Sequence, residues 1–442
     1  MGYLLGLSIA LRLVLLNQSL WLDESIQALA LMGRMGPLLT YALADYQPPL
    51  YHLLGYLTTQ VFEYSEVALR LLSLIAGVLT VYFVTRIGQE IGSKKTGFIA
   101  GLLAATNPLL IYYSQEGRTY ALTTFLVTAS FYYFLQILNN KNASKLHLTS
   151  YFLFTTAFLW TSYLSWFVLV AQGLYVIWKR RYDLLLLQVC SALTLLAWLP
   201  SFITSLGIGE STRSGSPEWG RVVGGLSWKS LPLTWVKFNL GRIGFDNKWL
   251  YGALVALIGL LHAWILRRVA FKKYLILLGW GIIPVVLGLA TAFVLPVYSY
   301  VRVLFVLPAY LLLLAIGLES RSSRITGLLI TLHLVCLSIF WFSPRYQREN
   351  WRLLTADLPA DAVLAMPSRA QNAPLLYYGY HQQIIEPSHE TLSGEKIYYI
   401  KYVEDLFDTT KLGQANFAKS GYTITSQKVY PGIQVDIYEN SH

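Results

Sequence analysis

The chain has 442 residues, of which 55% are hydrophobic and only 13% are charged, against roughly 25% charged residues in soluble globular proteins. This composition excludes a soluble protein, and apolar runs of about 20 residues, long enough to cross a bilayer, recur along most of the sequence. The 34 Lys and Arg residues outnumber the 23 Asp and Glu residues, but the excess lies mainly in short loops between apolar runs, which indicates membrane orientation and not nucleic-acid binding.

The apolar runs predict a polytopic α-helical membrane protein with about eleven transmembrane helices. The first run, Tyr3 to Leu20, begins without a basic segment or a small-residue cleavage site. We therefore expect a membrane helix there and not a removed signal peptide. The other predicted spans are 67–91, 97–112, 118–138, 148–163, 165–178, 184–205, 249–266, 274–295, 301–318 and 324–342.

Positive charges gather in alternate loops between these spans. The loops lie at 94–95, 141–145, 179–181, 267–273 and 321–324. Because Lys and Arg are retained on the cytoplasmic side of a membrane, these loops are predicted to be cytoplasmic. The extracytoplasmic side then receives residues 21–66, the turn at 113–118, a polar loop at 206–248 and everything after Ser343.

The C-terminal region is polar, has only short apolar runs, and predicts a small α/β domain. Alternating apolar and polar residues predict strands at 362–366, 396–403, 422–430 and 433–438, with helical patterns near 350–358 and 410–419. We therefore divide the chain into a membrane domain, 1–342, and an extracytoplasmic α/β domain, 343–442.

The first outer loop opens with two adjacent carboxylates, Asp23 and Glu24, directly after the first span. At the membrane rim the dielectric constant falls, so such carboxylates should be paired or sensitive to protonation. A carboxylate in this position can act as a general base. The alternative is that Asp23 caps a helix that begins at Glu24, because an Asp before a helix accepts hydrogen bonds from its free backbone amides.

The rest of this loop is too apolar to be a solvated connector. Apolar residues recur at helical spacing on both sides of Pro48 and Pro49, and short amphipathic segments suit helices that lie in the membrane interface. Because proline interrupts a helix, we predict two interfacial helices separated by the two prolines, which form a floor for a lipid-linked substrate.

Charged residues also occur at the outer ends of later spans. Glu116 and Arg118 lie in a tyrosine-rich turn, and Arg302 stands at the outer end of a later span. Arginine is disfavoured there unless it meets a charged group, and its planar fork suits phosphate oxygens. With the carboxylates, these arginines predict a site for a phosphate-bearing lipid. The alternatives are a Glu116–Arg118 ion pair within an aromatic belt and, for Arg302, snorkelling to lipid headgroups.

The motifs of the membrane part, taken in order, resemble those of the GT-C superfamily of membrane glycosyltransferases. They are similar in particular to bacterial members of glycosyltransferase family 39, which are related to protein O-mannosyltransferases and to the transferases that place aminoarabinose on lipid A. The similar segments are Trp21–Glu24, Gln47–Tyr51, Ala68–Leu71, Tyr113–Leu122, Val301–Val303, Pro308–Tyr310 and Glu349–Arg352.

The resemblance implies an inverting sugar transfer from a polyprenyl-phosphate donor to an acceptor, on the extracytoplasmic face of the bacterial inner membrane. It implies Asp23 as the base that deprotonates the acceptor, with Glu24 beside it, and Arg118 and Arg302 as contacts of the donor phosphate. The further residues that it places at the donor or substrate site are Gln47, Tyr51, His52, Arg70, Tyr113, Glu116 and Tyr120.

The sequence departs from the family in two places. Gln47 stands where the family often has a histidine before the two prolines. The basic residues that usually precede the first span are missing, which is what a truncated start would leave.

We expect no metal or other cofactor in the chemistry. No cluster of carboxylates or histidines has metal-ligand spacing, and arginine can neutralise the phosphate instead. A divalent metal is the alternative to this expectation.

The sequence does not determine which sugar is transferred. It also leaves four acceptors as alternatives: protein Ser or Thr, lipid A, a cell-wall glycan or another lipid-linked saccharide.

Two other functional classes stay open. A membrane transporter or lipid flippase would carry inverted repeats, interrupted helices and charges near the bilayer midplane, whereas the unusual charges here lie at one rim. In a scaffold protein whose tail binds envelope partners, Asp23, Glu116 and Arg118 would each be replaceable.

Overall fold

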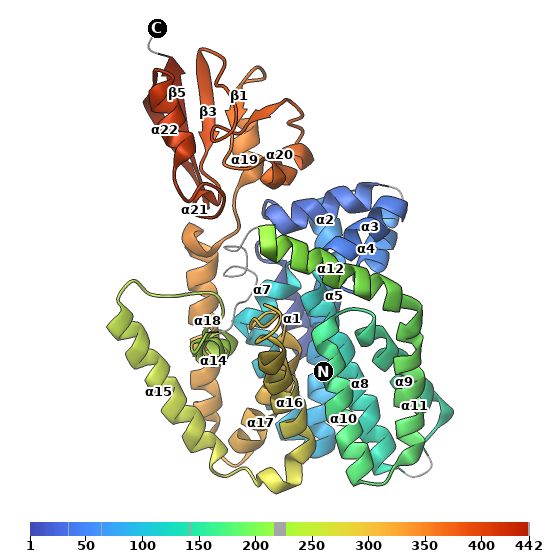
Figure 1. The fold of residues 1–442 in the computed structure, drawn as a ribbon. Helices are drawn as coiled ribbons and strands as arrows, with labels where there is room; N and C mark the ends of the chain where they lie inside the picture. The colour runs from blue at the N-terminus through green and yellow to red at the C-terminus, as the bar shows by residue number, and fades with distance from the viewer. Residues whose placement is uncertain (34, 63, 141–142, 216–226, 441–442) are drawn as a thin grey trace. The chain divides into compact units, whose positions relative to one another are not determined.

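The computed structural model describes residues 1–33, 35–62, 64–140, 143–215 and 227–440. The chain forms two compact units, each made from two stretches of sequence (Figure 1). The first unit consists of Met1–Leu16 and Met35–Ile339, and the second of Asn17–Arg34 and Phe340–His442. The second unit thus includes the start of the first outer loop as well as the C-terminal region.

The first unit is helical (Figure 1). Its helices are α1 (Gly2–Leu13), α3 (Met35–Ala44), α4 (Leu50–Val61), α5 (Glu66–Ile91), α6 (Lys94–Thr106), α7 (Pro108–Ser114), α8 (Thr119–Asn139), α9 (Lys145–Leu159), α10 (Trp166–Trp178), α11 (Tyr182–Leu193), α12 (Leu199–Gly215), α14 (Ser230–Leu240), α15 (Lys248–Leu266), α16 (Leu275–Thr291), α17 (Leu307–Glu319) and α18 (Ser323–Phe342), whose end belongs to the second unit.

Within the described ranges, 6 helical segments are long and apolar enough to cross a membrane. They are Glu66–Ile91, Thr119–Asn139, Tyr182–Gly207, Lys248–Leu266, Phe271–Thr291 and Ser323–Phe342. The other predicted spans correspond to shorter helices or to the bent pair α6 and α7. The prediction of a multi-pass helical membrane protein with a small C-terminal α/β part is confirmed.

The predicted span 97–112 is bent, because α6 and α7 meet at an angle of 58°. Pro108 has no N–H and cannot continue the hydrogen bonding of α6. Asn107 then starts α7, since its Oδ1 accepts hydrogen bonds of 3.0 Å from the N–H groups of Leu109 and Leu110.

The fully buried Arg12 of α1 compensates for this bend. Its guanidinium donates hydrogen bonds to the carbonyl oxygens of Ala105 (3.2 Å) and Ala104 (3.4 Å), at the end of α6. It also donates to the hydroxyls of Ser114 in α7 (3.1 Å) and Ser8 in its own helix (2.8 Å). One arginine therefore joins α1, α6 and α7.

The first predicted span, Tyr3–Leu20, is too long, because α1 ends at Leu13. The amide of Gln115 donates a hydrogen bond of 2.5 Å to the carbonyl oxygen of Val14. Leu15 adopts a left-handed backbone conformation with φ of 64°, which a helix cannot contain. Both features stop the helix before Leu20.

The first outer loop holds three helices and not the predicted two: α2 (Leu22–Met32), α3 and α4. The predicted break at the two prolines is confirmed, because α3 ends at Ala44 and α4 begins at Leu50. Part of the predicted polar loop at 206–248 is helical, in α12 and α14. Residues 216–226 of that loop lie outside the described residues, as does Lys141.

The second unit contains a five-stranded sheet with the order β2-β1-β3-β5-β4 (Figure 1). The strands are β1 (Val363–Ala365), β2 (Ile384–Ile385), β3 (Lys396–Ile400), β4 (Tyr422–Tyr430) and β5 (Ile433–Asn440), and the helices are α2, α19 (Trp351–Ala356), α20 (Ala373–Tyr377), α21 (Glu404–Phe407) and α22 (Leu412–Lys419). β1 pairs in parallel with β2 and β3, and β5 pairs antiparallel with β3 and β4. The four predicted strands correspond to β1, β3, β4 and β5, whereas the two-residue β2 was not predicted.

Alternate residues of β3 face two separate cores. Tyr398 and Ile400 pack into the first core, which also holds Leu22 of α2 and Trp351 of α19. Tyr399 packs into the second core, which includes α22. Helix α2 is therefore part of the folded C-terminal unit, although it precedes the rest of that unit by most of the chain.

A prediction concerns the close packing of α5 against α6, where Gly88 of α5 faces Gly97 of α6. A Cβ on Gly97 would lie 2.6 Å from the Thr85 carbonyl oxygen and 2.9 Å from the Gln89 backbone nitrogen. Because these backbone atoms cannot move aside, Gly97→Val should destabilise the protein by about 1–3 kcal/mol, the usual range for overpacking. Thermal unfolding in detergent would measure the loss as a lower Tm. Gly252→Val on α15, where a Cβ meets nothing within 4 Å, is the matched control, and equal Tm values for the two variants would contradict the packing.

Candidate functional site

Helix α2 begins too early for the predicted cap. Its first residue is Leu22 and its N-cap is Trp21, whose side chain makes no capping hydrogen bond. Leu22 packs inside the first core of the second unit, and Trp21 packs against that core. Asp23 and Glu24 therefore both lie inside the first turn, where the helix dipole favours negative charge. The alternative in which Asp23 caps a helix beginning at Glu24 is wrong.

The two adjacent carboxylates have different surroundings. Glu24 is fully buried, and its Oε2 lies 3.4 Å from Nε of Arg348, whose side chain is 1% exposed. Asp23 is only partly buried. Since a buried charge is tolerated when it is paired, Glu24 is anchored inside the unit, while Asp23 keeps part of its surface exposed.

Tyr402 lies close to both Asp23 and Glu349. Its hydroxyl donates a hydrogen bond of 3.2 Å to Oε1 of Glu349, and the indole N–H of Trp351 lies 3.4 Å from Oε2 of the same carboxylate. Burial, the charge of Glu349 and the charge of Asp23 together raise the pKa of the Tyr402 hydroxyl far above its usual value. Tyr402 therefore keeps its proton and acts as a hydrogen-bond donor beside Asp23.

A second group of predicted residues meets in the first unit, around Arg118. The guanidinium lies 2.6 Å from Oδ1 of Asp45 and donates a hydrogen bond of 2.8 Å to the hydroxyl of Tyr41. Both acceptors belong to α3 or the residue after it. Arg118 thus has a buried acidic partner from the first outer loop, in addition to the neighbouring Glu116, whose carbonyl accepts its backbone N–H.

Tyr51 and His52, the first residues after the start of α4, lie beside this pair. Nε2 of His52 is 3.5 Å from Oδ2 of Asp45. The Tyr51 hydroxyl lies 3.1 Å from the Ser73 hydroxyl, which in turn donates to the carbonyl oxygen of Arg118 (3.3 Å). The structure therefore brings together Tyr51, His52 and Arg118, three of the residues that the sequence nominated.

Arg242, in the segment after α14, was not predicted. It donates a hydrogen bond of 2.5 Å to the Tyr112 hydroxyl, and its guanidinium stacks over that ring at 4.7 Å. Burial opposes its charge, but nearby tyrosines and Glu116 stabilise the cation and raise its pKa. The residue nevertheless remains exposed. Tyr113 lies within reach of the same charges, and the ring of Tyr120 packs against it at 5.3 Å.

A second cation lies beside Arg242. Nζ of Lys237 donates a hydrogen bond of 3.1 Å to the carbonyl oxygen of Arg242. Burial and the charge of Arg242 lower the pKa of Lys237 to about 8. Two neighbouring cations create a region of positive potential, and an anion bound there would stabilise both charges.

Of the remaining predicted residues, the two arginines donate hydrogen bonds to backbone carbonyl oxygens. The fully buried Arg70 donates a hydrogen bond of 2.7 Å to the carbonyl oxygen of Leu16. Arg302 donates to the carbonyl oxygens of Pro296 and Val297 within its own loop, at 3.4 and 3.2 Å. Gln47 is partly buried in the turn between α3 and α4.

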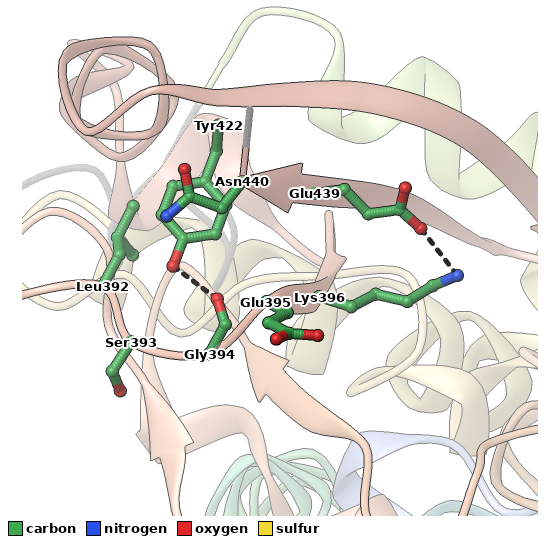
Figure 2. A pocket seen from close by; sticks show the side chains of 8 residues that line it. All are labelled: Leu392, Ser393, Gly394, Glu395, Lys396, Tyr422, Glu439 and Asn440. Atoms are coloured by element: carbon green, nitrogen blue, oxygen red, sulfur yellow. Dashed lines mark hydrogen bonds and ion pairs between the residues drawn. The ribbon is translucent and has the colours of Figure 1, made fainter. Parts of the chain in front are cut away.

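A polar hollow also lies at the edge of the C-terminal sheet (Figure 2). It is lined by Leu392, Ser393, Gly394, Glu395, Lys396, Tyr422, Glu439 and Asn440. Lys396 and Glu439 pair across it at 2.9 Å, and the Tyr422 hydroxyl donates to the Gly394 carbonyl oxygen at 2.6 Å. None of the predicted site residues lines this hollow. In the part of the chain that the structure describes, no group of three or more His, Cys, Asp or Glu side chains could hold a metal ion.

Comparison with known proteins gives a family match over part of the chain. Residues 46–207 match the family described as dolichyl-phosphate-mannose-protein mannosyltransferase. This segment includes Gln47, Tyr51, His52, Glu116 and Arg118. No curated protein matches the chain in sequence.

Solved structures share the fold along the whole chain. The crystal structure of ArnT from Cupriavidus metallidurans in the apo state matches with a TM-score of 0.58 and 11% identity, over 99% of this chain and 97% of that one. The same protein bound to undecaprenyl phosphate matches with a TM-score of 0.55 and 10% identity, over 99% and 96% of the two chains. The Archaeoglobus fulgidus oligosaccharyltransferase tethered to an acceptor peptide matches with a TM-score of 0.54 and 12% identity, over 100% of this chain and 74% of that one.

At these identities the structures establish the fold, and the family match adds the sequence relationship. The sequence match is confined to residues 46–207, and both findings agree with the resemblance to the GT-C membrane glycosyltransferases that the motifs indicated.

A prediction concerns His52. Burial, the largest influence, lowers its pKa to about 4; Arg118 lowers it further, while the charge of Asp45 acts in the opposite direction. The unfolded chain takes up a proton near the ordinary histidine pKa of about 6.5, before the folded chain does, so the folded state loses stability as the pH falls through this window. Between about pH 7.5 and pH 5 the wild type should lose about 2 kcal/mol more stability than His52→Gln. Unfolding in detergent at the two pH values checks this, with His381→Gln, an exposed histidine, as control; the same pH dependence in wild type and His52→Gln would contradict it.

Proposed function

We propose that the protein transfers a hexose or pentose from a polyprenyl-phosphate donor to a hydroxyl group of an extracytoplasmic acceptor, with inversion at the anomeric carbon. The observation that carries the proposal is the partly buried Asp23 in the first turn of α2, next to a carboxylate that is already ion-paired. Two proteins with this fold support a lipid-phosphate ligand, since one was solved with undecaprenyl phosphate and the other with a dolichol-phosphate.

In the proposed reaction Asp23 is the general base. Its carboxylate takes the proton of the acceptor hydroxyl, whose oxygen attacks the anomeric carbon of the sugar. The bond between that carbon and the phosphate oxygen breaks, and polyprenyl phosphate leaves with the bonding electrons. A single displacement of this kind inverts the configuration at the anomeric carbon. The helix dipole favours the negative charge of this carboxylate in the first turn of α2, and the Tyr402 hydroxyl is close enough to interact with it electrostatically.

The leaving phosphate requires positive charge. Arg118 and Arg302 are the arginines that the sequence nominated, and the structure adds Arg242 with its neighbour Lys237. Arg242 is the strongest candidate of the four, because it is exposed and a second cation raises the local potential. These groups can supply the charge stabilisation, so we assign no step to a metal or cofactor.

The proposed location is the bacterial inner membrane, with the active site and the C-terminus on the extracytoplasmic side. The alternate positive loops support this orientation. The acceptor is a hydroxyl of a protein, lipid or glycan.

The first test of the proposal is Asp23→Asn, which keeps the size of the side chain and removes its basicity. Turnover should fall by about two to four orders of magnitude, the usual contribution of a positioned base, while binding of undecaprenyl phosphate is retained. The assay uses purified protein, a panel of radiolabelled undecaprenyl-phosphate sugars and an envelope fraction as acceptor. Asp357→Asn, an exposed carboxylate of the same unit that accepts a tyrosine hydrogen bond, should transfer at the wild-type rate. Normal turnover by Asp23→Asn would exclude Asp23 as the base.

The second test addresses the donor phosphate. Hydrogen bonds to charged groups contribute roughly 1.5–3 kcal/mol, so Arg242→Ala and Arg118→Ala should each weaken undecaprenyl-phosphate binding by about ten-fold or more. Lysine should restore binding only in part, because it keeps the charge and loses the planar fork. Equilibrium binding in detergent measures the effect. Arg86→Ala, which removes another exposed arginine placed near a tyrosine, is the control, and wild-type affinity in both test variants would remove these arginines from the donor site.

A further inference from the structure

Helix α2 is fixed to the C-terminal region at several points. The backbone N–H of Leu20, just before α2, donates a hydrogen bond of 2.8 Å to the hydroxyl of Tyr378. The guanidinium of Arg352 in α19 donates to the carbonyl oxygen of Asn17 (2.9 Å). Leu22 packs in the same core as strands β1, β3 and β5. The helix that carries Asp23 is therefore held as a fixed part of the second unit.

Of two consecutive residues in the C-terminal region, the first contacts a carboxylate of α2 and the second contacts Tyr402. Arg348 contacts the buried Glu24 (3.4 Å). Glu349 accepts the hydrogen bond of Tyr402, which lies within the field of Asp23. Neither Glu24 nor Arg348 is exposed at its side chain by more than 1%, so this contact cannot be replaced by water without opening the unit.

We propose that Arg348 is a positioning residue for the transfer reaction: through its buried ion pair with Glu24 it fixes the first turn of α2 and thereby the orientation of Asp23. This inference rests on the proposed function and assigns different tasks to the two neighbouring carboxylates. Glu24 is the anchor of the turn, and Asp23 is the base.

The physical reason is the asymmetry of a buried ion pair. Removal of one partner takes away an opposite charge from the other, which stays buried, so the surrounding turn must move to compensate for the loss. Replacement of both partners by neutral side chains of similar size leaves no such charge, and this change is often tolerated. Because a displacement of about 1 Å at a catalytic group can cost about 100-fold in rate, a shift of the turn should appear in the rate of transfer.

The test compares Arg348→Met, Glu24→Gln and the double variant that combines them. Each single variant should lower kcat by about 10- to 100-fold, when kcat is normalised to the number of molecules that bind undecaprenyl phosphate. The KM for the donor should stay near the wild-type value. The double variant should recover kcat to within a few-fold of wild type, and Arg348→Lys should lie between wild type and Arg348→Met. A purely structural role for the pair would reduce the number of folded molecules and leave the normalised kcat unchanged.

The matched control is Arg369→Met, which removes an arginine of the same unit that is ion-paired with Glu390 at the surface. Its normalised kcat should equal that of wild type. A wild-type kcat for Arg348→Met would overturn the proposal. A double variant as inactive as Glu24→Gln would also overturn it, because Glu24 would then be the base.

The proposed function fails in a different way. If wild type transfers no sugar from any donor of the panel, or if Asp23→Asn transfers normally, the function is wrong and the positioning role falls with it. If wild type is active, Asp23→Asn is inactive and Arg348→Met is normal, only the role of Arg348 is wrong. Should Arg348→Met not fold, the double variant alone decides, since it contains no unpaired charge.

Discussion

A buried arginine in an apolar chain needs hydrogen-bond acceptors within the protein, and Arg12 shows how much of the first unit follows from this constraint. The bend at Pro108 deprives the end of α6 of its normal donors, and the guanidinium supplies replacements at Ala104 and Ala105. The bend alone would leave carbonyl oxygens without donors, and the buried guanidinium alone would lack acceptors. Each therefore supplies the hydrogen-bond partners that the other needs. Together they set the direction of α7, and with it the turn that leads to Glu116 and Arg118.

The same principle operates in the second unit with a different result. Glu24 and Arg348 form a buried ion pair, and Glu24 is removed from solvent, while its neighbour Asp23 is only partly buried. The two adjacent carboxylates thus differ in burial, and the buried one pairs with an arginine from the opposite end of the sequence. In the first unit, the exposed Arg242 and the partly buried Lys237 lie close together, and burial and the charge of Arg242 lower the pKa of Lys237.

Local pattern was sufficient for much of the fold and for part of the candidate site. Apolar runs located the long helices, alternation located β1, β3, β4 and β5, and the two prolines located the start of α4. Asp23 and Arg118 were recognisable because charges at a membrane rim are costly. By contrast, the early end of α1 depends on Gln115, and the early start of α2 depends on a core made by the C-terminal strands. Neither partner is near in sequence.

The missed residues have a similar explanation. Arg242 lies in a polar loop where an arginine is unremarkable, and only the tertiary fold brings it to Tyr112. Arg348 directly precedes a motif that was noticed, yet nothing local shows that it reaches Glu24. Likewise, sequence spacing suggested Glu116 as the ionic partner of Arg118, whereas the structure also provides Asp45, the residue after α3. Such contacts are set by long-range packing, for which a single sequence has no periodic signal.

The inclusion of α2 in the C-terminal unit also has a consequence for the order of biosynthesis. Leu22 packs with Trp351, Tyr398 and Val435, so the ribosome must complete nearly the whole chain before α2 can find its partners. At about 5–20 residues per second, that delay is on the order of 20–80 seconds. During this time the helix emerges with its apolar face uncovered and its Glu24 unpaired. Helix α2 is therefore among the first segments to be made and among the last to reach its final environment.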